Sequence, residues 1–239
     1  FETEVIGFIM TLATVIGFVA LFNSSVLSSE PDEARFPIMG IDVSHHQKAI
    51  NWQQVAEAGV HFAYIKSSEG RDFLDTQFQQ NWVAAAEAGI PRGAYHFFTF
   101  CSPGKAQAEH FLKTAPPEQL ALPPVADVEF VGNCKSFGDL KDVRQEFREF
   151  LTLVEQAWGV KPILYLTPDV LERVLGSDLT EYPIWIRSIQ SEPRSDQYRE
   201  WVLWQFSASS QINGIVGPVD HNALSPGLTL NDLRLPASD

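Results

Sequence analysis

The sequence predicts an α/β domain, an irregular TIM-like (β/α)5(β)3 barrel, from three observations. Short apolar runs, typical of buried strands, alternate with longer amphipathic segments typical of helices. Glycines and prolines stand where these segments end. After Pro183 the alternation stops, and apolar runs follow one another without long helical segments between them. Strict alternation favours parallel strands joined by crossover helices, so we expect five β/α units and then three further strands.

The first three β/α units are predicted before residue 115. Gly59 and Gly89 stand just past the first two helices, as C-terminal caps do, and Ser102-Pro103 precedes the third helix. The segments are the strand Phe36–Val43, the helix Trp52–Ala58, the strand His61–Lys66, the helix Thr76–Ala88, the strand Gly93–Phe100 and the helix Gly104–Thr114.

The later segments complete the five units and add the three strands. In barrels of this kind the active site lies at the C-terminal ends of the strands, so the residues that end a strand are candidates for chemistry. The segments are the strand Val125–Val131, the helix Leu140–Trp158, the strand Pro162–Leu166, the short helix Pro168–Leu175, and the strands Ile184–Ser188, Trp201–Phe206 and Val216–Asp220.

An apolar segment precedes this domain. Val5 to Phe22 contains no charged residue and is about long enough to span a bilayer as a helix, and a polar stretch follows it. We therefore expect a hydrophobic signal anchor or signal peptide at residues 1–24, a polar linker at 25–35 and one folded domain at 36–239. Because no Ala-x-Ala site follows the apolar run, an uncleaved anchor is favoured. Either reading places the domain outside the cytoplasm.

Composition argues against two classes of protein. The formal net charge is −13, whereas a nucleic-acid binder needs clustered Lys and Arg to track phosphates. With 45% hydrophobic and 20% charged residues and no low-complexity tract, the main body is not expected to be disordered.

The two cysteines, Cys101 and Cys134, each follow a predicted strand. If those strands are neighbours in a parallel sheet, both thiols lie at its C-terminal rim and could form a disulfide. The alternative is two free thiols, and the apolar leader favours the disulfide because it indicates an oxidising compartment. Without a CxxC motif or a matching His cluster, we expect no metal site and no thiol nucleophile.

Asp127 and Glu129 are two carboxylates on one predicted strand. Side chains at i and i+2 share a face, and their Cα atoms should be about 6.6 Å apart. Mutual repulsion and desolvation should raise at least one pKa, as a general acid requires. A solvated or salt-bridged pair is the alternative, and the apolar neighbours Val125, Val128 and Phe130 weigh against it.

Asp42 and Asp220 end the first and the last predicted strands. Each alone is more typical of a turn or a helix cap. If the two strands close the barrel, however, both aspartates come close to each other and to Asp127 and Glu129.

Aromatic and amide side chains near these acids could form a sugar-binding groove. Rings stack on the apolar faces of pyranoses, and phenol and amide groups bond to hydroxyls, but core packing is the commoner role, so we expect about half of the set to bind. The candidates are Tyr95, His96, Tyr165, Trp185, Trp204 and Gln205.

Several of these motifs, taken in order from Met39 to about Leu224, resemble the glycoside hydrolase family 25 lysozymes. The motifs span nearly the whole domain, so together they are more specific than any one of them. They are Gly40-Ile41-Asp42-Val43-Ser44 with Gln47 and Trp52, Tyr64-Ile65-Lys66 with Glu69-Gly70, Gly93-Ala94-Tyr95-His96-Phe97, Asp127-Val128-Glu129, Trp204-Gln205, and Val219-Asp220-His221-Asn222.

The resemblance implies a flattened barrel and cleavage of the β-1,4 bond between N-acetylmuramic acid and N-acetylglucosamine in peptidoglycan glycan strands. It implies Glu129 as general acid/base and Asp127 as the residue that orients the substrate acetamido group. Asp42 and Asp220 would complete an acidic floor. Tyr64 and Asn222 join the candidate substrate-binding residues through the same resemblance.

Two features depart from the family pattern, and both concern the outer subsites. No tyrosine follows Trp185 in Trp185-Ile186-Arg187-Ser188-Ile189, and Phe206 stands where a tyrosine is common. The cysteine pair is similar to that of the Gram-negative branch. This similarity suggests a domain anchored in the inner membrane and facing the periplasm, or one secreted or periplasmic if the leader is cleaved.

An acid pair on a single strand favours substrate-assisted hydrolysis with retention, because both groups approach one side of the sugar ring. No cofactor is expected, and the catalytic domain is expected to be monomeric. A chitinase-like hydrolase and a catalytically silent wall-binding module remain alternatives. A metal-dependent hydrolase using the four acids as ligands is the third, and against it we expect insensitivity to chelators.

Overall fold

The computed structural model describes residues 30–194, 198 and 200–233. The predicted hydrophobic segment at 1–24, the first part of the linker and residues 234–239 lie outside the described residues. In the described ranges, no helix combines the length and the apolar character that crossing a bilayer requires.

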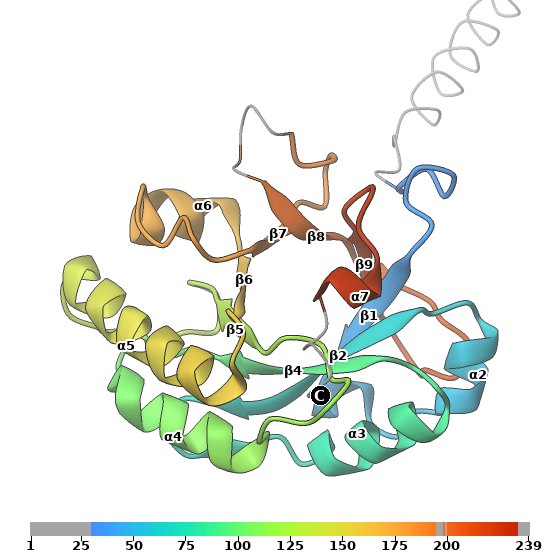
Figure 1. Cartoon of the computed structure of the whole chain (residues 1–239), viewed down its shortest axis with the longest axis horizontal. Coiled ribbons are helices and arrows are strands. Elements are labelled where there is room, and N and C mark those ends of the chain that lie inside the picture. The colour runs from blue at the N-terminus through green and yellow to red at the C-terminus, as the bar shows by residue number, and fades with distance from the viewer. Residues whose placement is uncertain (1–29, 195–197, 199, 234–239) are drawn as a thin grey trace, which may run out of the picture.

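Eight strands close into a barrel, as predicted. β1 pairs in parallel with β2, and parallel pairing continues through β4, β5, β6, β7 and β8. β9 runs antiparallel to both β8 and β1 and closes the ring (Figure 1). The short β3 pairs with β2 outside the ring. The strands are β1 Met39–Val43, β2 Phe62–Glu69, β3 Phe73–Leu74, β4 Arg92–Phe97, β5 Val125–Val128, β6 Ile163–Leu166, β7 Ile184–Arg187, β8 Trp201–Ser210 and β9 Val219–Leu224.

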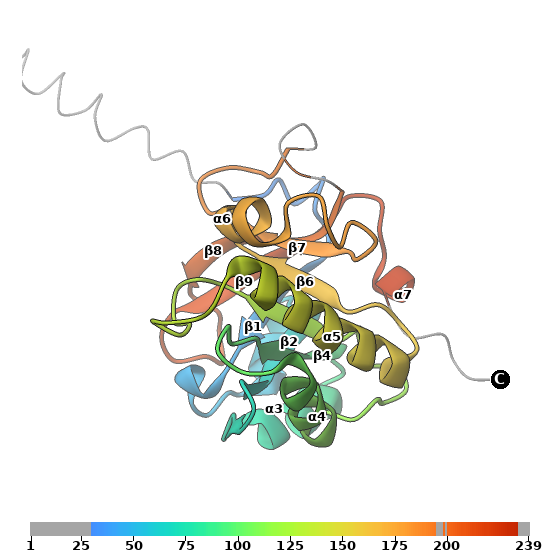
Figure 2. The same ribbon diagram turned by 90° about the vertical axis from the view of Figure 1, so that its left-hand side faces the viewer.

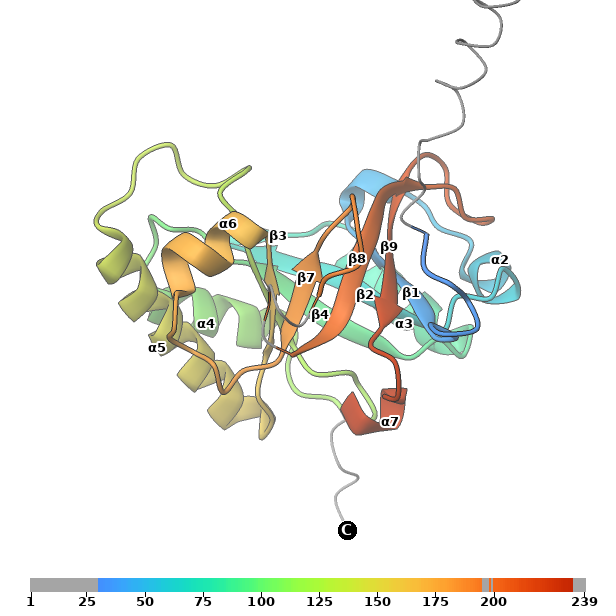
Figure 3. The ribbon, with the colours of Figure 1, turned by 90° about the horizontal axis from the view of Figure 1, so that it is seen from above.

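The helices α2 to α6 form an arc around the outside of the strands (Figure 1). Figure 2 shows α5 lying across the sheet beside α4, and Figure 3 shows β7, β8 and β9 on the side of the described chain that no helix crosses. The helices are α2 Trp52–Glu57, α3 Phe78–Glu87, α4 Gly104–Thr114, α5 Leu140–Trp158, α6 Pro168–Val170, which the π-helical turn η2 Leu171–Leu175 continues, and α7 Leu230–Leu233; η1 His45–Gln47 is a 3-10 turn.

Helix α5 shows why sequence signals set the element bounds. Asp139 caps its start, because the carboxylate accepts a hydrogen bond from the backbone N–H of Lys141 at 2.9 Å. Gly159 ends it with a φ of 71°, a conformation that favours glycine. Both α4 and α5 match the predicted bounds.

Side chains alternate along each strand and so build separate apolar clusters inside and outside the barrel. One cluster, which includes Phe62, Ile163 and Trp185, fills the interior of the barrel. A second lies between the strands and the helices, and a third covers the outer face of β8 and β9. The second cluster includes Ile65, Phe147 and Leu164. The third includes Phe36, Trp204 and Phe206.

Several strand bounds differ from the prediction. β1 begins at Met39, because Phe36 instead packs against Trp204 on the outside of the barrel, with ring centroids 5.5 Å apart. β9 begins at Val219 and runs on to Leu224, whereas Val216 is 82% exposed in the preceding turn. β4 and β5 end earlier than predicted, and β3, η1 and α7 were not predicted.

Candidate active site

The four predicted acids meet around one pit. It measures about 90 Å³ and lies at the ends of β1, β4, β5 and β6, where β9 joins them. The proposed closure of the barrel by the first and last strands is therefore confirmed, and it brings Asp42 opposite Asp220 in the β1–β9 register. The pit is lined by Asp42, Tyr95, Val125, Asp127, Glu129, Tyr165, Trp185 and Asp220.

A larger outer pocket of about 410 Å³ adjoins the pit. Glu129, Tyr165 and Asp220 line both spaces, and Arg187 and Asp169 line the outer pocket alone. Glu129 therefore stands at the boundary, where it can reach a group held in either space.

Asp42 and Asp220 are joined by a side-chain hydrogen bond, which requires one of the two carboxyls to carry a proton. Burial and the charge of Asp220 raise the pKa of Asp42 well above its usual value. Burial also raises the pKa of Asp220, but the hydrogen bond from Asp42 and the charge of Arg187 oppose that rise. We therefore place the proton on Asp42, which donates it to Asp220 in a hydrogen bond.

Two hydrogen-bonded arms hold Asp42 in place. Its Oδ2 accepts from Asn222 Nδ2 at 2.8 Å and from Gln205 Nε2 at 3.3 Å. Behind these amides, Trp185 Nε1 donates to Asn222 Oδ1 at 3.0 Å, and the Tyr165 hydroxyl donates to Gln205 Oε1 at 2.8 Å. The arms fix both amide orientations, so each N–H points at the acid.

Asp127 is 9% exposed, and its Oδ1 accepts no hydrogen bond within the described part of the chain. Burial, followed by the charge of Glu129, raises its pKa well above the usual value, and Lys66 only partly opposes this. A buried carboxylate oxygen without a donor is costly, so the site is built to receive a donor from a ligand.

Glu129 is half-buried, and burial raises its pKa. The nearby charge of Arg187 opposes this rise, whereas Asp220 and Asp169 add to it. A raised pKa favours the protonated carboxyl, which is the form that general acid catalysis requires.

Three of the predicted sugar-binding aromatics, Tyr95, Tyr165 and Trp185, line the pit. Gln205 lines the outer pocket. Asn222 is fully buried and lines neither space, so it acts on the site through Asp42.

Three other residues predicted to bind sugar, His96, Trp204 and Tyr64, are buried and do not line the pit. His96 follows Tyr95 on β4 and therefore faces the helices, where its Nδ1 lies 2.8 Å from Ser68 Oγ and its ring stacks on Phe150. Burial lowers the pKa of His96 to about 3.

Trp204 likewise faces outward, and its indole N–H donates to Ser188 O at 2.8 Å. Tyr64 does face the barrel interior, but it is fully buried beneath Trp185, with ring centroids 5.1 Å apart. A sugar in the pit would meet Trp185 before it met Tyr64.

The prediction missed three charged residues of the site, Arg187, Asp169 and Lys66. Arg187 lies two residues after Trp185 and therefore shares its inward face, and Lys66 is related to Tyr64 in the same way. Asp169 lies in the first turn of the helix after β6. The i+2 rule applied to these strands would have found the two cations.

The cysteines form the predicted disulfide, which joins the loops after β4 and β5. Asn133 ties the same loops together. Its Oδ1 accepts from the backbone N–H of Phe100 at 2.8 Å, and its Nδ2 donates to the backbone carbonyls of Phe98 and Glu129, each at 2.9 Å. The backbone that carries Glu129 is therefore fastened to the neighbouring loop.

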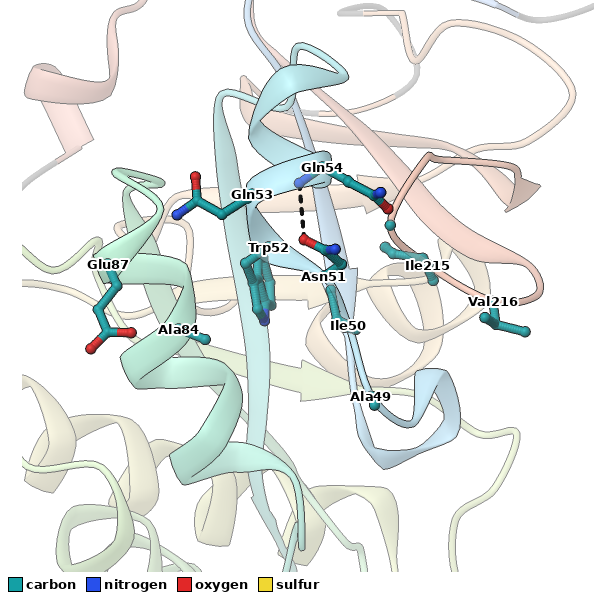
Figure 4. A pocket seen from close by; sticks show the side chains of 11 residues that line it. Ala49, Ile50, Asn51, Trp52, Gln53, Gln54, Ala84, Glu87, Ile215 and Val216 are labelled. Carbon is teal, nitrogen blue, oxygen red and sulfur yellow. Dashed lines mark hydrogen bonds between the residues drawn. The ribbon is translucent and has the colours of Figure 1, made fainter.

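A separate hollow of about 660 Å³ lies outside the barrel, between α2, α3 and the turn before β9 (Figure 4). Its wall includes Trp52 and the N-cap of α2, where Asn51 Oδ1 accepts from the backbone N–H of Gln54 at 3.2 Å. Glu87 is the one acid among its lining residues, so this hollow lacks the paired carboxylates of the pit.

Comparison with known proteins agrees with this geometry. The family model of glycosyl hydrolases family 25 matches residues 41–215. The chain is 36% identical to YegX of Escherichia coli K12 over 197 residues, which cover 80% of this chain and 71% of that protein. It is 32% identical to lysozyme M1 of Streptomyces globisporus over 196 residues, 77% of this chain and 67% of that protein.

Two solved structures are similar along most of their length. A family 25 glycosyl hydrolase from Bacillus anthracis superposes with a TM-score of 0.77 at 35% identity, covering 84% of this chain and 94% of that one. A bacterial lysozyme from Streptomyces coelicolor gives a TM-score of 0.73 at 29% identity, covering 82% and 94%. With the acid cluster in the pit and a family match over most of the barrel, the chain belongs to family 25 of the glycosyl hydrolases.

Proposed function

We propose that this protein is a lysozyme that hydrolyses the β-1,4 bond between N-acetylmuramic acid and N-acetylglucosamine in peptidoglycan, with participation of the substrate acetamido group. The observation that carries the proposal is the pairing of Asp127 with Glu129. One acid offers a buried oxygen without a donor, and the other, whose pKa is raised by burial, lies at the boundary of two spaces.

In the first step Glu129 donates its proton to the glycosidic oxygen, and the bond between that oxygen and the anomeric carbon breaks. The acetamido carbonyl oxygen of the sugar in the pit attacks the anomeric carbon from the opposite face and forms an oxazolinium-like ring. Asp127 Oδ1 accepts the acetamido N–H, which keeps the group aligned and stabilises its developing positive charge.

In the second step the Glu129 carboxylate takes a proton from a water molecule. The resulting hydroxide attacks the anomeric carbon from the face that the leaving group vacated and reopens the ring. Two inversions give net retention of configuration. Because Asp42 is neutral, Asp220 is the only charged member of this pair. The pair therefore repels the Asp127 carboxylate less than two ionised aspartates would.

The decisive experiment combines Glu129→Gln with a matched control, Glu87→Gln, in the hollow of Figure 4. We expect Glu129→Gln to lose nearly all release of reducing ends from purified peptidoglycan, while Glu87→Gln retains it. Mass analysis of the products should show muramic acid at the new reducing end, and NMR should show the retained anomer first.

Four results would overturn the proposal in different ways. Substantial turnover by Glu129→Gln would reassign the acid. First formation of the inverted anomer would remove the acetamido mechanism. A wild-type protein that binds peptidoglycan but releases no reducing ends would be a wall-binding module, and preference for chitin oligomers would make it a chitinase-like enzyme.

We further propose that the domain works outside the cytoplasm as a monomer, held at the inner membrane by residues 1–24 or released if they are cleaved. The disulfide supports an oxidising compartment, and one chain supplies every wall of the pit. Fractionation of cells that express the full chain, with thiol alkylation and light scattering of the purified protein, tests all three points. A cytoplasmic pool with free thiols would contradict the location, and a dimer would contradict the monomer.

A further inference from the structure

Arg187 holds a position in the outer pocket that the catalytic steps above do not use. It ends β7 and lines the pocket together with Glu129 and Asp220. Because it lies two residues after Trp185, it extends the inward face of that strand toward the rim. The side chain is half-buried, so part of its guanidinium surface stays open to the pocket.

The guanidinium of Arg187 has no partner among the described residues, in either an ion pair or a hydrogen bond. Its charge reaches Glu129 and Asp220 only through space. Arg173 lies over the ring of Phe130, and five other arginines of the described chain each lie within ion-pair distance of a carboxylate. These are Arg35, Arg71, Arg92, Arg144 and Arg148.

A half-buried guanidinium with free donors is matched in shape and charge to a carboxylate, which it binds through two parallel hydrogen bonds. An anionic ligand needs this cation in order to bind, because the other charged residues that line the pocket are acidic. Glu129, Asp220 and Asp169 line the same pocket, and the chain as a whole carries a net charge of −13. Without Arg187 the pocket would repel an anion.

We propose that Arg187 forms a subsite that recognises a carboxylate borne by the glycan next to the bond that is cut. The inference rests on the proposed lysozyme function, because peptidoglycan carries such carboxylates and chitin does not. Two sources share this chemistry: the lactyl carboxylate of muramic acid where the stem peptide is absent, and the carboxylates of the stem peptide where it is present. Arg187 is thus a specificity-determining residue for wall glycan.

The test compares three preparations of the same glycan strands. The first is denuded strands with free lactyl carboxylates, the second is the same strands with those carboxylates converted to methyl esters, and the third is peptide-bearing strands. The variants are Arg187→Gln, Arg187→Lys, which keeps the charge but loses the planar fork, and Arg148→Gln as a surface control.

We expect Arg187→Gln to raise KM by roughly 10- to 100-fold on one carboxylate-bearing preparation and by less than about twofold on the methyl ester. A rise in KM on the denuded strands identifies the lactyl carboxylate as the group that Arg187 binds. A rise in KM on the peptide-bearing strands alone identifies the carboxylates of the stem peptide. The KM of Arg187→Lys should lie between those of the wild type and Arg187→Gln, and the KM of Arg148→Gln should equal that of the wild type. A change of equal size on ester and acid, or a shift of the pH profile with KM unchanged, would overturn the proposal.

A second measurement separates this inference from the proposed function. Fragments with a free or an esterified lactyl carboxylate, and a stem-peptide-bearing fragment, are titrated into Glu129→Gln and into Glu129→Gln with Arg187→Gln. Weaker binding of only the carboxylate-bearing fragments to the double variant supports the subsite, even if the wild type proves unable to cut any strand. Equal binding of every fragment to both proteins rejects it.

Discussion

Asp127 illustrates how a single residue can favour function over stability. It is buried, one of its oxygens lacks a donor, and its pKa lies well above the usual value because of burial and Glu129. The folded state therefore holds a proton that the unfolded chain releases at about pH 3.9. Stability falls as the pH rises from that value through the raised pKa, because ionising the folded protein becomes costly.

Asp127→Asn should accordingly be more stable than the wild type at neutral pH. We expect the melting temperature at pH 7 to rise by roughly 3 °C, about 1 kcal/mol, while activity falls strongly. The gain should disappear below about pH 4, where the carboxyl is protonated in both states. Calorimetry across this pH range measures it, with the exposed Asp72→Asn as control. A variant that is less stable than wild type at pH 7 would refute the argument.

His96 contributes to stability and not to the site, although it is adjacent in sequence to Tyr95, which lines the pit. It is fully buried between β4 and the helices, bonded to Ser68 and stacked on Phe150. We expect His96→Ala to destabilise the fold by roughly 3 kcal/mol, because it leaves a cavity and removes the buried hydrogen bond to Ser68. Unfolding in denaturant checks this value.

The KM of the folded fraction of His96→Ala should stay within about twofold of wild type. Tyr95→Ala, one residue earlier and on the pit wall, should change KM with little loss of stability by comparison. If His96→Ala raised KM without destabilising the protein, the placement of His96 outside the binding site would be refuted.

At the scale of elements, the disulfide and Asn133 together hold the loop that carries Glu129. Cys101 and Cys134 are 33 residues apart, and a cross-link of that span should contribute about 3.5 kcal/mol in the chain-entropy model. We expect the double substitution to Ser to lower the melting temperature by roughly 7 to 14 °C. Thermal unfolding with and without reductant gives the value, since reductant should affect the wild type and spare the double variant.

Asn133→Ala separates the two restraints, because it keeps the cross-link and removes the bonds to the loops. We expect kcat to fall several-fold with KM little changed. The substitution should disturb the alignment of Glu129, whereas the shape of the pocket should stay the same. An unaltered kcat would show that the disulfide alone suffices.

The sequence predicted the elements well where local signals were strong and less well where tertiary contacts decided. The caps of α5 and the proline before α4 mark their ends within the chain itself. Phe36 reads as the start of a strand because it is apolar, yet it packs on the outside of β8, a partner far along the sequence. The turn that exposes Val216 depends on the closure of the barrel, whereas its apolar residues Ile215 and Val216 resemble the start of a strand.

The candidate site shows the same division. Asp42, Asp127 and Glu129 could be found because each lies at or just past the C-terminal end of a strand. Asp220 instead lies near the start of β9, whose antiparallel direction brings that start to the same rim. The prediction chose both members of two neighbouring pairs, Tyr95-His96 and Trp204-Gln205. Because only one of two adjacent strand residues can face the pit, His96 and Trp204 face away from it. Which member faces inward follows once the inward acids fix the register.

At the scale of the whole molecule, the net charge opposes the proposed substrate. A chain of charge −13 approaching an anionic wall is repelled over the Debye length, about 30 Å at 0.01 M salt and 8 Å at 0.15 M. We expect kcat/KM on intact peptidoglycan to rise several-fold between these salt concentrations. Turnover assays on peptidoglycan and on short uncharged glycan fragments test this, because the fragments should show almost no salt dependence. A fall in kcat/KM with salt on the polymer would contradict it.

The closing seam between β1 and β9 has a consequence for when the protein becomes active. The hydrogen-bonded partners Asp42 and Asp220 come from the opposite ends of the ring and meet only when the last strand docks beside the first. A nascent chain that still lacks β9 has no such pair, however well its helices have formed. We therefore expect a chain whose β9 has not yet docked to be inactive, because this carboxyl pair is then absent.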